Sequence, residues 1–583
     1  MTLTNHQPNL LPKICCLILL GISCARCKNA NEAPPALYVP EGFEVTVFID
    51  SIAETTRHLA VASNGILYTK FKKSSAEGTL AALLDSNTDG IADSLVKFAS
   101  DTTLRRSYGY ATACRIYKDY LYFSTELAVY RFKLDLETMV PTGPRETIVI
   151  DDHPHGMHEH IGKPIAFDNN GNLYVPFGAP SNACQEPKRT PQQPGLDPCP
   201  QLEDHGGIWV FDAETPNQTQ HNGRKYATGL RSIVGMDWNQ EDQALYAVVH
   251  GRDDLFRLWP DKYNPWESAM LPSEEFIKVE EGDNFGWPYC YYDQIQQKRV
   301  QSPEYGGDGN LIGNCEDFKN PIMGFPGHWA PNDLVFYRGD AFPEYYKNGA
   351  FIAFHGSTNR GPYPQSGYFI GFIPFKDGKP TGSYDVFADG FAQVDPIVNV
   401  RDAVYRPMGI AFGEDGTMYI GDTEKGRIWS VKFTGGKTSF GPKNLEKMEE
   451  RKSLSHIRTP DFINDDLSEK TTDSGHRLYN TYCAACHQAD GNGASGRFPP
   501  LSQTDWVIGE KDRLVKVILN GMEGPIQVNG DDYNSLMPQH SFLMDEDIAA
   551  VLNYVRTHFG NSADSVSVQE VQQIRLNNQK SIP

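Results

Sequence analysis

The sequence is short of positive charge. Its 583 residues include 53 lysines and arginines against 74 aspartates and glutamates, which gives a net charge of −21. A chain of this sign repels a phosphate backbone, so no nucleic-acid partner is expected. An anionic ligand would need a local cluster of arginines that works against the overall field.

Long hydrophobic runs are also lacking. The apolar run at residues 14–20 is roughly half of the ~20 residues that a membrane-spanning helix requires. It follows Lys13 and leads to Ser23-Cys24, the order seen in a signal peptide cleaved before an acylated cysteine. We expect export to the periplasm or cell envelope with a lipid anchor at Cys24. An ordinary signal peptide cleaved near Ala25 or Ala30 is the alternative.

Cysteine is scarce, with 11 residues in the whole chain. Export to an oxidising compartment permits disulfides, and the nearest pairs in loop-like sequence are Cys184 with Cys199 and Cys290 with Cys315. Spacing alone does not prove this connectivity. Cys114 lies in an apolar, strand-like run and is expected to be a buried thiol.

The most specific motif is Cys483-Ala-Ala-Cys486-His487. Two thiols at this spacing add to the two vinyl groups of haem, and the adjacent imidazole then coordinates the iron. A thioredoxin-like pair of cysteines is the alternative, but it needs a preceding βαβ pattern and gives His487 no role. The motif therefore predicts one covalently bound haem c and an electron carrier.

The sequence around this motif is typical of a small helical cytochrome. A short amphipathic helix is expected near residues 475–479, and a second begins at Asp545 with apolar residues at helical spacing. Between them lies Met537, which Pro538 follows, and its thioether is the expected sixth iron ligand. Met544 is expected to be a core residue instead. The segment at 498–501 resembles the haem edge of small bacterial cytochromes c, and the domain is placed at 466–560.

The high counts of glycine (52), proline (39) and tyrosine (28) point to turns and aromatic strands, which excludes a coiled coil or a long helical bundle. A short apolar strand recurs six times, mostly after a turn, starting at residues 65, 119, 171, 243, 349 and 416. The spacing is about the length of a four-stranded blade with insertions. We therefore predict an all-β six-bladed β-propeller at 37–435. Insertions at 181–207 and 256–330 are expected to form loops over one face, where a ligand pocket belongs.

The ordered set of segments in this region resembles the glucose/sorbosone dehydrogenases. It comprises Val39-Pro-Glu-Gly-Phe43, Tyr226-Ala-Thr-Gly-Leu-Arg231, Asn284-Phe-Gly-Trp-Pro288, Ala330-Pro331 with Phe336-Tyr337, and Arg406-Pro-Met-Gly-Ile-Ala411. Members of that family are six-bladed propellers that use pyrroloquinoline quinone (PQQ) and calcium. The resemblance implies PQQ-dependent oxidation of a sugar or polyol.

The resemblance also implies site residues. His160 matches the catalytic base, and Arg231 matches the arginine that contacts the reacting quinone oxygen. Arg406 matches the first of two cofactor-binding arginines, whereas the second position is Met408; Arg360 is the candidate for the missing charge. Because His153, His155 and His158 lie near His160, His158 is an alternative base, and a metal site or a solvated loop are alternatives for the whole cluster.

Calcium is predicted at two places. The resemblance implies the backbone carbonyls of Gly251 and Arg252. Separately, oxygen-bearing side chains stand at positions 1, 3, 5 and 9 of a loop around a turn-forming glycine, as in an EF-hand that lacks its last glutamate. These side chains are Asp85, Asn87, Asp89 and Asp93. A plain acidic turn is the alternative.

The sequence thus predicts a multi-domain chain. Residues 1–36 form the signal and anchor, 37–435 the propeller, 436–465 a linker, 466–560 the cytochrome and 561–583 a flexible tail. The expected function is a quinohaemoprotein that oxidises a sugar or polyol with PQQ. Electrons would pass to haem c and on to a cytochrome or oxidase. The alternative is a cofactor-free propeller that binds a carbohydrate or protein and carries an electron-transfer cytochrome.

Overall fold

A computed structural model describes residues 37–583 except 102–103, 105–112, 154–157, 455, 458–473 and 580–583. The predicted signal and anchor at 1–36 and His155 lie outside the described residues. Within the described part of the chain, no helix is both long and apolar enough to cross a membrane.

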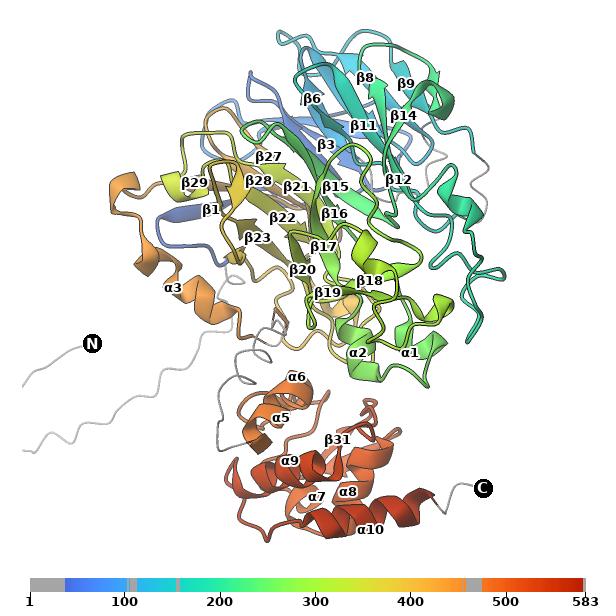
Figure 1. The fold of residues 1–583 in the computed structure, drawn as a ribbon. Helices are drawn as coiled ribbons and strands as arrows, with labels where there is room; N and C mark the ends of the chain where they lie inside the picture. The colour runs from blue at the N-terminus through green and yellow to red at the C-terminus, as the bar shows by residue number, and fades with distance from the viewer. Residues whose placement is uncertain are drawn as a thin grey trace, which may run out of the picture. The chain divides into compact units, whose positions relative to one another are not determined.

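Six sheets of four or five strands, antiparallel except where β13 pairs with β9, follow one another along the chain between residues 43 and 433 (Figure 1). The first three contain β2–β5 (Thr56–Val61, Leu67–Phe71, Leu80–Leu84, Ser94–Phe98), β6–β9 (Cys114–Tyr117, Tyr120–Ser124, Ala128–Lys133, Glu146–Ile150) with β13 (Gln218–Thr219), and β10, β11, β12 and β14 (Ala166–Phe167, Asn172–Phe177, Gly207–Asp212, Arg224–Thr228). The last three contain β15, β16, β17 and β20 (Ile233–Asn239, Ala244–Val249, Glu274–Val279, Met323–Phe325), β21, β22, β23 and β26 (Pro331–Phe336, Ala350–Phe354, Phe369–Ile373, Asp385–Ala388), and β27–β29 (Pro407–Phe412, Met418–Asp422, Ile428–Phe433) with β1 (Phe43–Ile49). These sheets are the blades of the predicted six-bladed propeller.

The ring is closed by strands from its two ends. β1 pairs antiparallel with β29, from Phe43 opposite Phe433 to Ile49 opposite Ile428. Phe43 is buried and packs edge-on against Phe342 and Phe387 of the preceding blade, with ring centroids 4.8 and 5.0 Å apart. The first strand of the chain therefore completes the last blade, and its aromatic side chain joins two blades.

The recurring apolar motif marks the second strand of every blade. Its six copies fall at the starts of β3, β7, β11, β16, β22 and β28. In three copies the turn glycine has a left-handed backbone, with φ of +84° at Gly65, +90° at Gly171 and +81° at Gly416, a conformation that other residues adopt only at a cost. In these three blades the turn before the second strand therefore needs a glycine, and the sequence supplies one.

The two long insertions differ in character. Residues 181–207 form a loop that the Cys184–Cys199 disulfide closes. Residues 256–330 are more than a loop, because blade strands β17 and β20 run through them, as do α2 (Pro265–Met270), β18 (Cys290–Asp293) and β19 (Lys298–Gln301), with α1 (Leu255–Leu258) just before. The Cys290–Cys315 disulfide is also present, and Cys114 is a fully buried free thiol. Both predicted pairings are confirmed.

The predicted linker at 436–465 is partly helical. α3 (Pro442–Arg451) packs against β26, with Met448 buried. Arg451 forms an ion pair with Asp389, whose side chain is fully buried. The buried carboxylate of Asp389, which belongs to the propeller, needs a cation, and Arg451 of α3 supplies it. This ion pair fixes α3 to the propeller.

The C-terminal part is helical, as predicted. It contains α5 (Ser474–Tyr482), α6 (Ala484–His487), α7 (Asp505–Ile508), α8 (Lys511–Asn520), the β30–β31 hairpin (Ile526–Val528, Asp531–Tyr533), α9 (Asp545–Thr557) and α10 (Val568–Gln579). α5 crosses α9 closely, since a Cβ on Gly475 would lie 2.4 Å from the carbonyl oxygen of Ala550. The prediction of a flexible tail at 561–583 is wrong where α10 forms. This helix buries Val571 and Ile574 against the same core.

Candidate functional site

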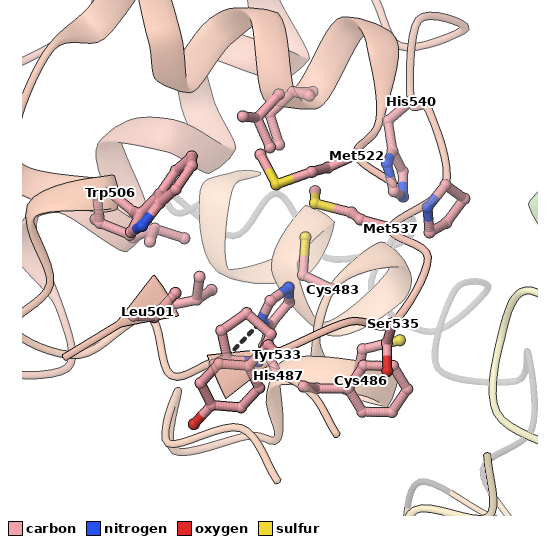
Figure 2. Close-up of a pocket in the computed structure, with 18 of the residues that line it drawn as sticks. Cys483, Cys486, His487, Leu501, Trp506, Met522, Tyr533, Ser535, Met537 and His540 are labelled. Atoms are coloured by element: carbon pink, nitrogen blue, oxygen red, sulfur yellow. Dashed lines mark hydrogen bonds between the residues drawn. The ribbon is translucent and has the colours of Figure 1, made fainter. Parts of the chain in front are cut away.

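A cavity in the C-terminal helical part brings the cysteine motif together with the predicted axial ligands (Figure 2). Cys483, Cys486 and His487 line it, and neither thiol is in a disulfide. The predicted haem-edge segment at 498–501 contributes to the same wall. The remaining lining is mostly apolar and comes largely from α5, α7, α8, α9, the β30–β31 hairpin and the segment that follows it. A flat, largely apolar macrocycle fits this cavity.

His487 is held in the orientation that a metal ligand needs. Its Nδ1 lies 2.9 Å from the carbonyl oxygen of Pro499. Because a carbonyl only accepts, Nδ1 carries the proton and donates it, which leaves the Nε2 lone pair free for iron. The side chain is buried. The proline segment that the sequence analysis singled out therefore also fixes the proximal imidazole.

The structure distinguishes between the two predicted methionines. Met537 lines the cavity, whereas Met544 precedes α9 with 65% of its surface exposed. Met544 is thus neither a ligand nor the core residue that we predicted, because the N-cap position of α9 places it in solvent. A third methionine, Met522, also lines the cavity. The sequence analysis missed it because no recognised motif surrounds it.

A second cavity, of about 690 Å³, lies in the propeller. Its polar lining comes from several blades: His158, Glu159, His160, Arg189, Arg231, His250, Asp253, Glu274, His328, Asn332, His355, Asn359 and Arg406. His250 and His355 directly follow β16 and β22, the second strands of their blades. This equivalent position was the signal that would have located both histidines from the sequence.

His160 fits the role of a general base. Its Nδ1 lies 2.8 Å from the carbonyl oxygen of Ala179, so Nδ1 carries the proton and Nε2 is the basic nitrogen. Burial, together with the positive charge of Arg231, holds the pKa of His160 well below its usual value. The imidazole is therefore neutral at pH 7. His158 lines the cavity too, but its ring packs against His205, with centroids 4.9 Å apart.

Arg231 is buried beside His160 and is oriented by a carboxylate. It donates to Asp253 at 2.7 Å and to the amide oxygen of Asn182 at 2.8 Å, and it also donates to the carbonyl of Gly251. Burial raises the pKa of Asp253, but neighbouring cations, Arg231 foremost, hold it far below its usual value. The Nε of Arg231 is buried and has no partner. One N–H donor of this buried guanidinium is thus unsatisfied within the chain.

Arg406 and Arg360 have different surroundings. Arg406 lines the cavity and binds the backbone of His355 and Gly356. Arg360 does not line it: its guanidinium donates to the carbonyls of Pro364, Ala269 and Gly327 inside the fold. The prediction that Arg360 supplies a cofactor-binding charge is wrong, since these carbonyls already occupy its donors.

A group of cations that the sequence analysis missed lies near Arg406. Arg57, at the start of β2, is buried, and its Nε has no partner. Burial, and then the charge of Arg406, lowers the pKa of Arg57 to about 10. Lys70 is fully buried, and burial lowers its pKa to about 8. Burial also lowers the pKa of Lys72, while Glu424 opposes this shift. Arg57, Lys70, Lys72 and Arg406 together form what we call the cation cluster.

Neither predicted calcium site is formed by a cluster of ligating side chains. Among the described residues, no group of three or more histidine, cysteine, aspartate or glutamate side chains could hold a metal ion. In the loop that begins at Asp85, the carboxylates accept from backbone N–H groups, such as Gly90 to Asp85 at 2.8 Å. The side chain of Arg252 turns inward to pair with Glu304, so only its backbone stays available. Calcium remains a prediction.

The propeller matches a known family over almost its whole length. The model of the TrAA12-like family covers residues 37–434. A solved structure of a family AA12 carbohydrate-active enzyme from Trichoderma reesei is similar, with a TM-score of 0.55 and 20% identity, covering 70% of this chain and all of that one. The PQQ domain of pyranose dehydrogenase from Coprinopsis cinerea, in its holo form, has a TM-score of 0.53 at 18% identity, covering 69% of this chain and 99% of that one. At these identities the two structures show the fold alone.

The cytochrome c family model covers residues 472–559. Cytochrome c-552 of Thermus thermophilus is 41% identical over 92 residues, which span 15% of this chain and 70% of that protein. The cytochrome subunit of fructose dehydrogenase from Gluconobacter japonicus is 38% identical over 115 residues, 18% of this chain and only 22% of that subunit. The protein therefore belongs to the TrAA12-like family and carries a C-terminal cytochrome c domain, whose thiols, imidazole and cavity fit haem c.

Proposed function

We propose that the protein is a PQQ-dependent dehydrogenase that oxidises a sugar or related polyol and passes the electrons to its own haem c. One observation carries the proposal: the propeller cavity holds His160, neutral with a free Nε2, beside the buried arginine Arg231. A base and an anion-binding cation in one cavity are what hydroxyl oxidation by a carboxylated quinone needs. The pyranose dehydrogenase PQQ domain, whose fold is similar, supports this interpretation.

The residues of the site fit an anionic cofactor. PQQ has three carboxylates, and the Nε atoms of Arg231 and Arg57 are buried and lack a partner within the chain. Arg231 and Arg406 line the cavity, and Arg57 is buried next to Arg406. A guanidinium binds a carboxylate through two parallel hydrogen bonds. We assign cofactor binding to Arg231, Arg406 and Arg57, so that Arg57 supplies the charge that Met408 lacks.

The other residues accept the substrate's proton and hold Arg231 in place. When bound, PQQ accepts hydride from the carbon that carries the hydroxyl group. His160 takes the hydroxyl proton at Nε2 while Ala179 holds its other nitrogen. Asp253 keeps Arg231 in place, and Asn359 donates to the same carboxylate at 2.7 Å.

The proposal also includes the electron acceptors, a calcium ion and the location of the protein. The similarity to cytochrome subunits of fructose and quinone-linked alcohol dehydrogenases supports haem c as the acceptor within the chain. We infer an onward cytochrome or oxidase as the next carrier. We also propose that calcium binds with PQQ beside the carbonyls of Gly251 and Arg252, and that the chain is exported and anchored through Cys24.

The proposal is tested with the full haem-containing chain loaded with PQQ and calcium. Reduction of the haem by a panel of aldoses and polyols is followed by stopped-flow absorbance, and PQQ affinity is measured by equilibrium dialysis. His160→Ala is expected to slow haem reduction about 10²–10⁴-fold with unchanged PQQ affinity. Arg231→Ala is expected to weaken PQQ binding as well. Because the pKa of His160 is lowered, activity should persist below pH 6.5, where an ordinary histidine would be protonated.

The matched control is Arg224→Ala, since Arg224 is an exposed arginine paired with Glu281. It should behave like the unmodified protein. If no sugar or polyol reduces the haem, the dehydrogenase is refuted. If both site variants match the control, the cavity is not the active site.

A further inference from the structure

Two methionines lie side by side on one wall of the cavity that fits haem c. Met522 and Met537 form an isolated antiparallel bridge, in which each backbone N–H donates to the other carbonyl, at 3.0 and 2.9 Å. In such a reciprocally bonded pair, directly opposite residues project their side chains to the same face. Both methionines line the cavity, and Figure 2 shows both thioethers directed into it.

The close approach of the two segments depends on Gly521. Its φ is +67°, and a Cβ at this position would lie 2.4 Å from the carbonyl oxygen of Met537. Only glycine accepts this backbone without strain. The register that brings the two thioethers together is therefore built into the fold.

We propose that Met522 is an alternative to Met537 as the sixth ligand of the haem iron. Its thioether would bind the iron when the Met537 thioether is lost. The exchange breaks one iron–sulfur bond and forms another, with no change in the oxidation state of iron and no proton transfer. Methionine is unbranched, with a flexible side chain, so a thioether that starts from the opposite residue of the bridge reaches the same face of the iron. The haem would keep histidine–methionine ligation, and with it the relatively high potential that such ligation gives.

The inference rests on the cytochrome and not on the chemistry of the propeller, so its test needs no substrate. The full chain is produced with covalent haem as Met537→Leu, Met522→Leu and the double variant, because leucine preserves apolar volume. The sulfur-to-iron charge-transfer band of the ferric protein and the midpoint potential are measured. Met544→Leu is the control, since Met544 is exposed.

Each single variant should retain the charge-transfer band and a potential close to that of the control. Only the double variant should lose the band and fall in potential. Carbon monoxide should bind the ferrous double variant at least tenfold faster than either single variant, because nothing then occupies the sixth position. Haem staining on a denaturing gel checks that haem is attached in all four proteins.

The proposal is overturned if Met537→Leu loses the band while it keeps its haem. The same holds if nitrogen replaces sulfur at the iron, which would point to His540, a buried histidine on the same wall. If Met537→Leu does not accumulate with haem, Met537→Ala removes the same thioether and is judged by the same two criteria.

Discussion

Arg57 offers the sharpest test of how the propeller would bind an anionic cofactor. Its guanidinium is buried beside Arg406, and its Nε has no partner. Arg57→Met preserves most of the apolar length of the side chain and removes the charge. A hydrogen bond to a charged group contributes about 1.5–3 kcal/mol, which corresponds to roughly 10–150-fold in Kd at 1.4 kcal/mol per tenfold. We expect PQQ to bind that much more weakly.

Although Arg57→Met should weaken PQQ binding, it should not lower the stability of the cofactor-free protein. Burial and the charge of Arg406 lower the pKa of Arg57 in the folded state, so the folded chain without an anion disfavours the charged form more than the unfolded chain does. Removing the charge is therefore expected to leave the cofactor-free propeller as stable as before, or more so. Arg360→Met is the contrast, because it leaves three buried carbonyls without their donor and should destabilise the fold without changing the affinity of folded molecules for PQQ.

The assay combines thermal unfolding without cofactor with equilibrium dialysis of PQQ in the presence of calcium. The assignment is supported if Arg57→Met binds PQQ more weakly and is as stable as the unmodified protein. Arg360→Met should instead be less stable and bind PQQ with unchanged affinity. Unchanged PQQ affinity in Arg57→Met would refute it, as would weaker binding in Arg360→Met at equal folded fraction.

Three further predictions address the rest of the chain. Replacing both Cys483 and Cys486 by alanine should abolish haem staining on a denaturing gel, and retained staining would refute covalent attachment. Cys24→Ser should release the protein from the membrane fraction or block its maturation; a normally processed, membrane-bound variant would exclude lipidation there. Deletion of residues 561–583 should lower the unfolding temperature of the haem domain, because Val571 and Ile574 are buried and each apolar side chain contributes about 1.5–3 kcal/mol; an unchanged temperature would mean that α10 adds nothing.

The fold was predictable because its signals are local. Each blade repeats a turn followed by a short apolar strand, and the backbone at Gly65, Gly171 and Gly416 requires glycine. The haem motif is equally local, since the two haem-attaching cysteines and the iron-ligating histidine fall within five positions. By contrast, α10 carries few apolar residues, and its burial depends on contacts with α8 and α9, which no short window of sequence reveals.

The propeller site was harder to predict because its residues come from different blades. Arg360 and Arg57 are both buried arginines, but only the structure shows that carbonyls occupy the donors of Arg360 and that the Nε of Arg57 is unpartnered. Met522 went unnoticed for the same reason, since it meets Met537 through a bridge across fifteen residues. Which polar groups remain unpaired is a property of the packed structure.

The charge distribution connects the composition to the proposed chemistry. In a chain with a net charge of −21, Arg57 and Lys70 are buried and Lys72 is half-buried. Each loses hydration, and the charge of Arg57 repels both lysines and Arg406. Glu126 and Glu424 offset part of this repulsion, and Asp422 interacts with Arg406, so four cations face three carboxylates. The anionic cofactor proposed for this site would supply further negative charge, and its binding to the folded chain alone would stabilise the fold. The proposed anion site is therefore a local excess of cations in a chain that is acidic overall.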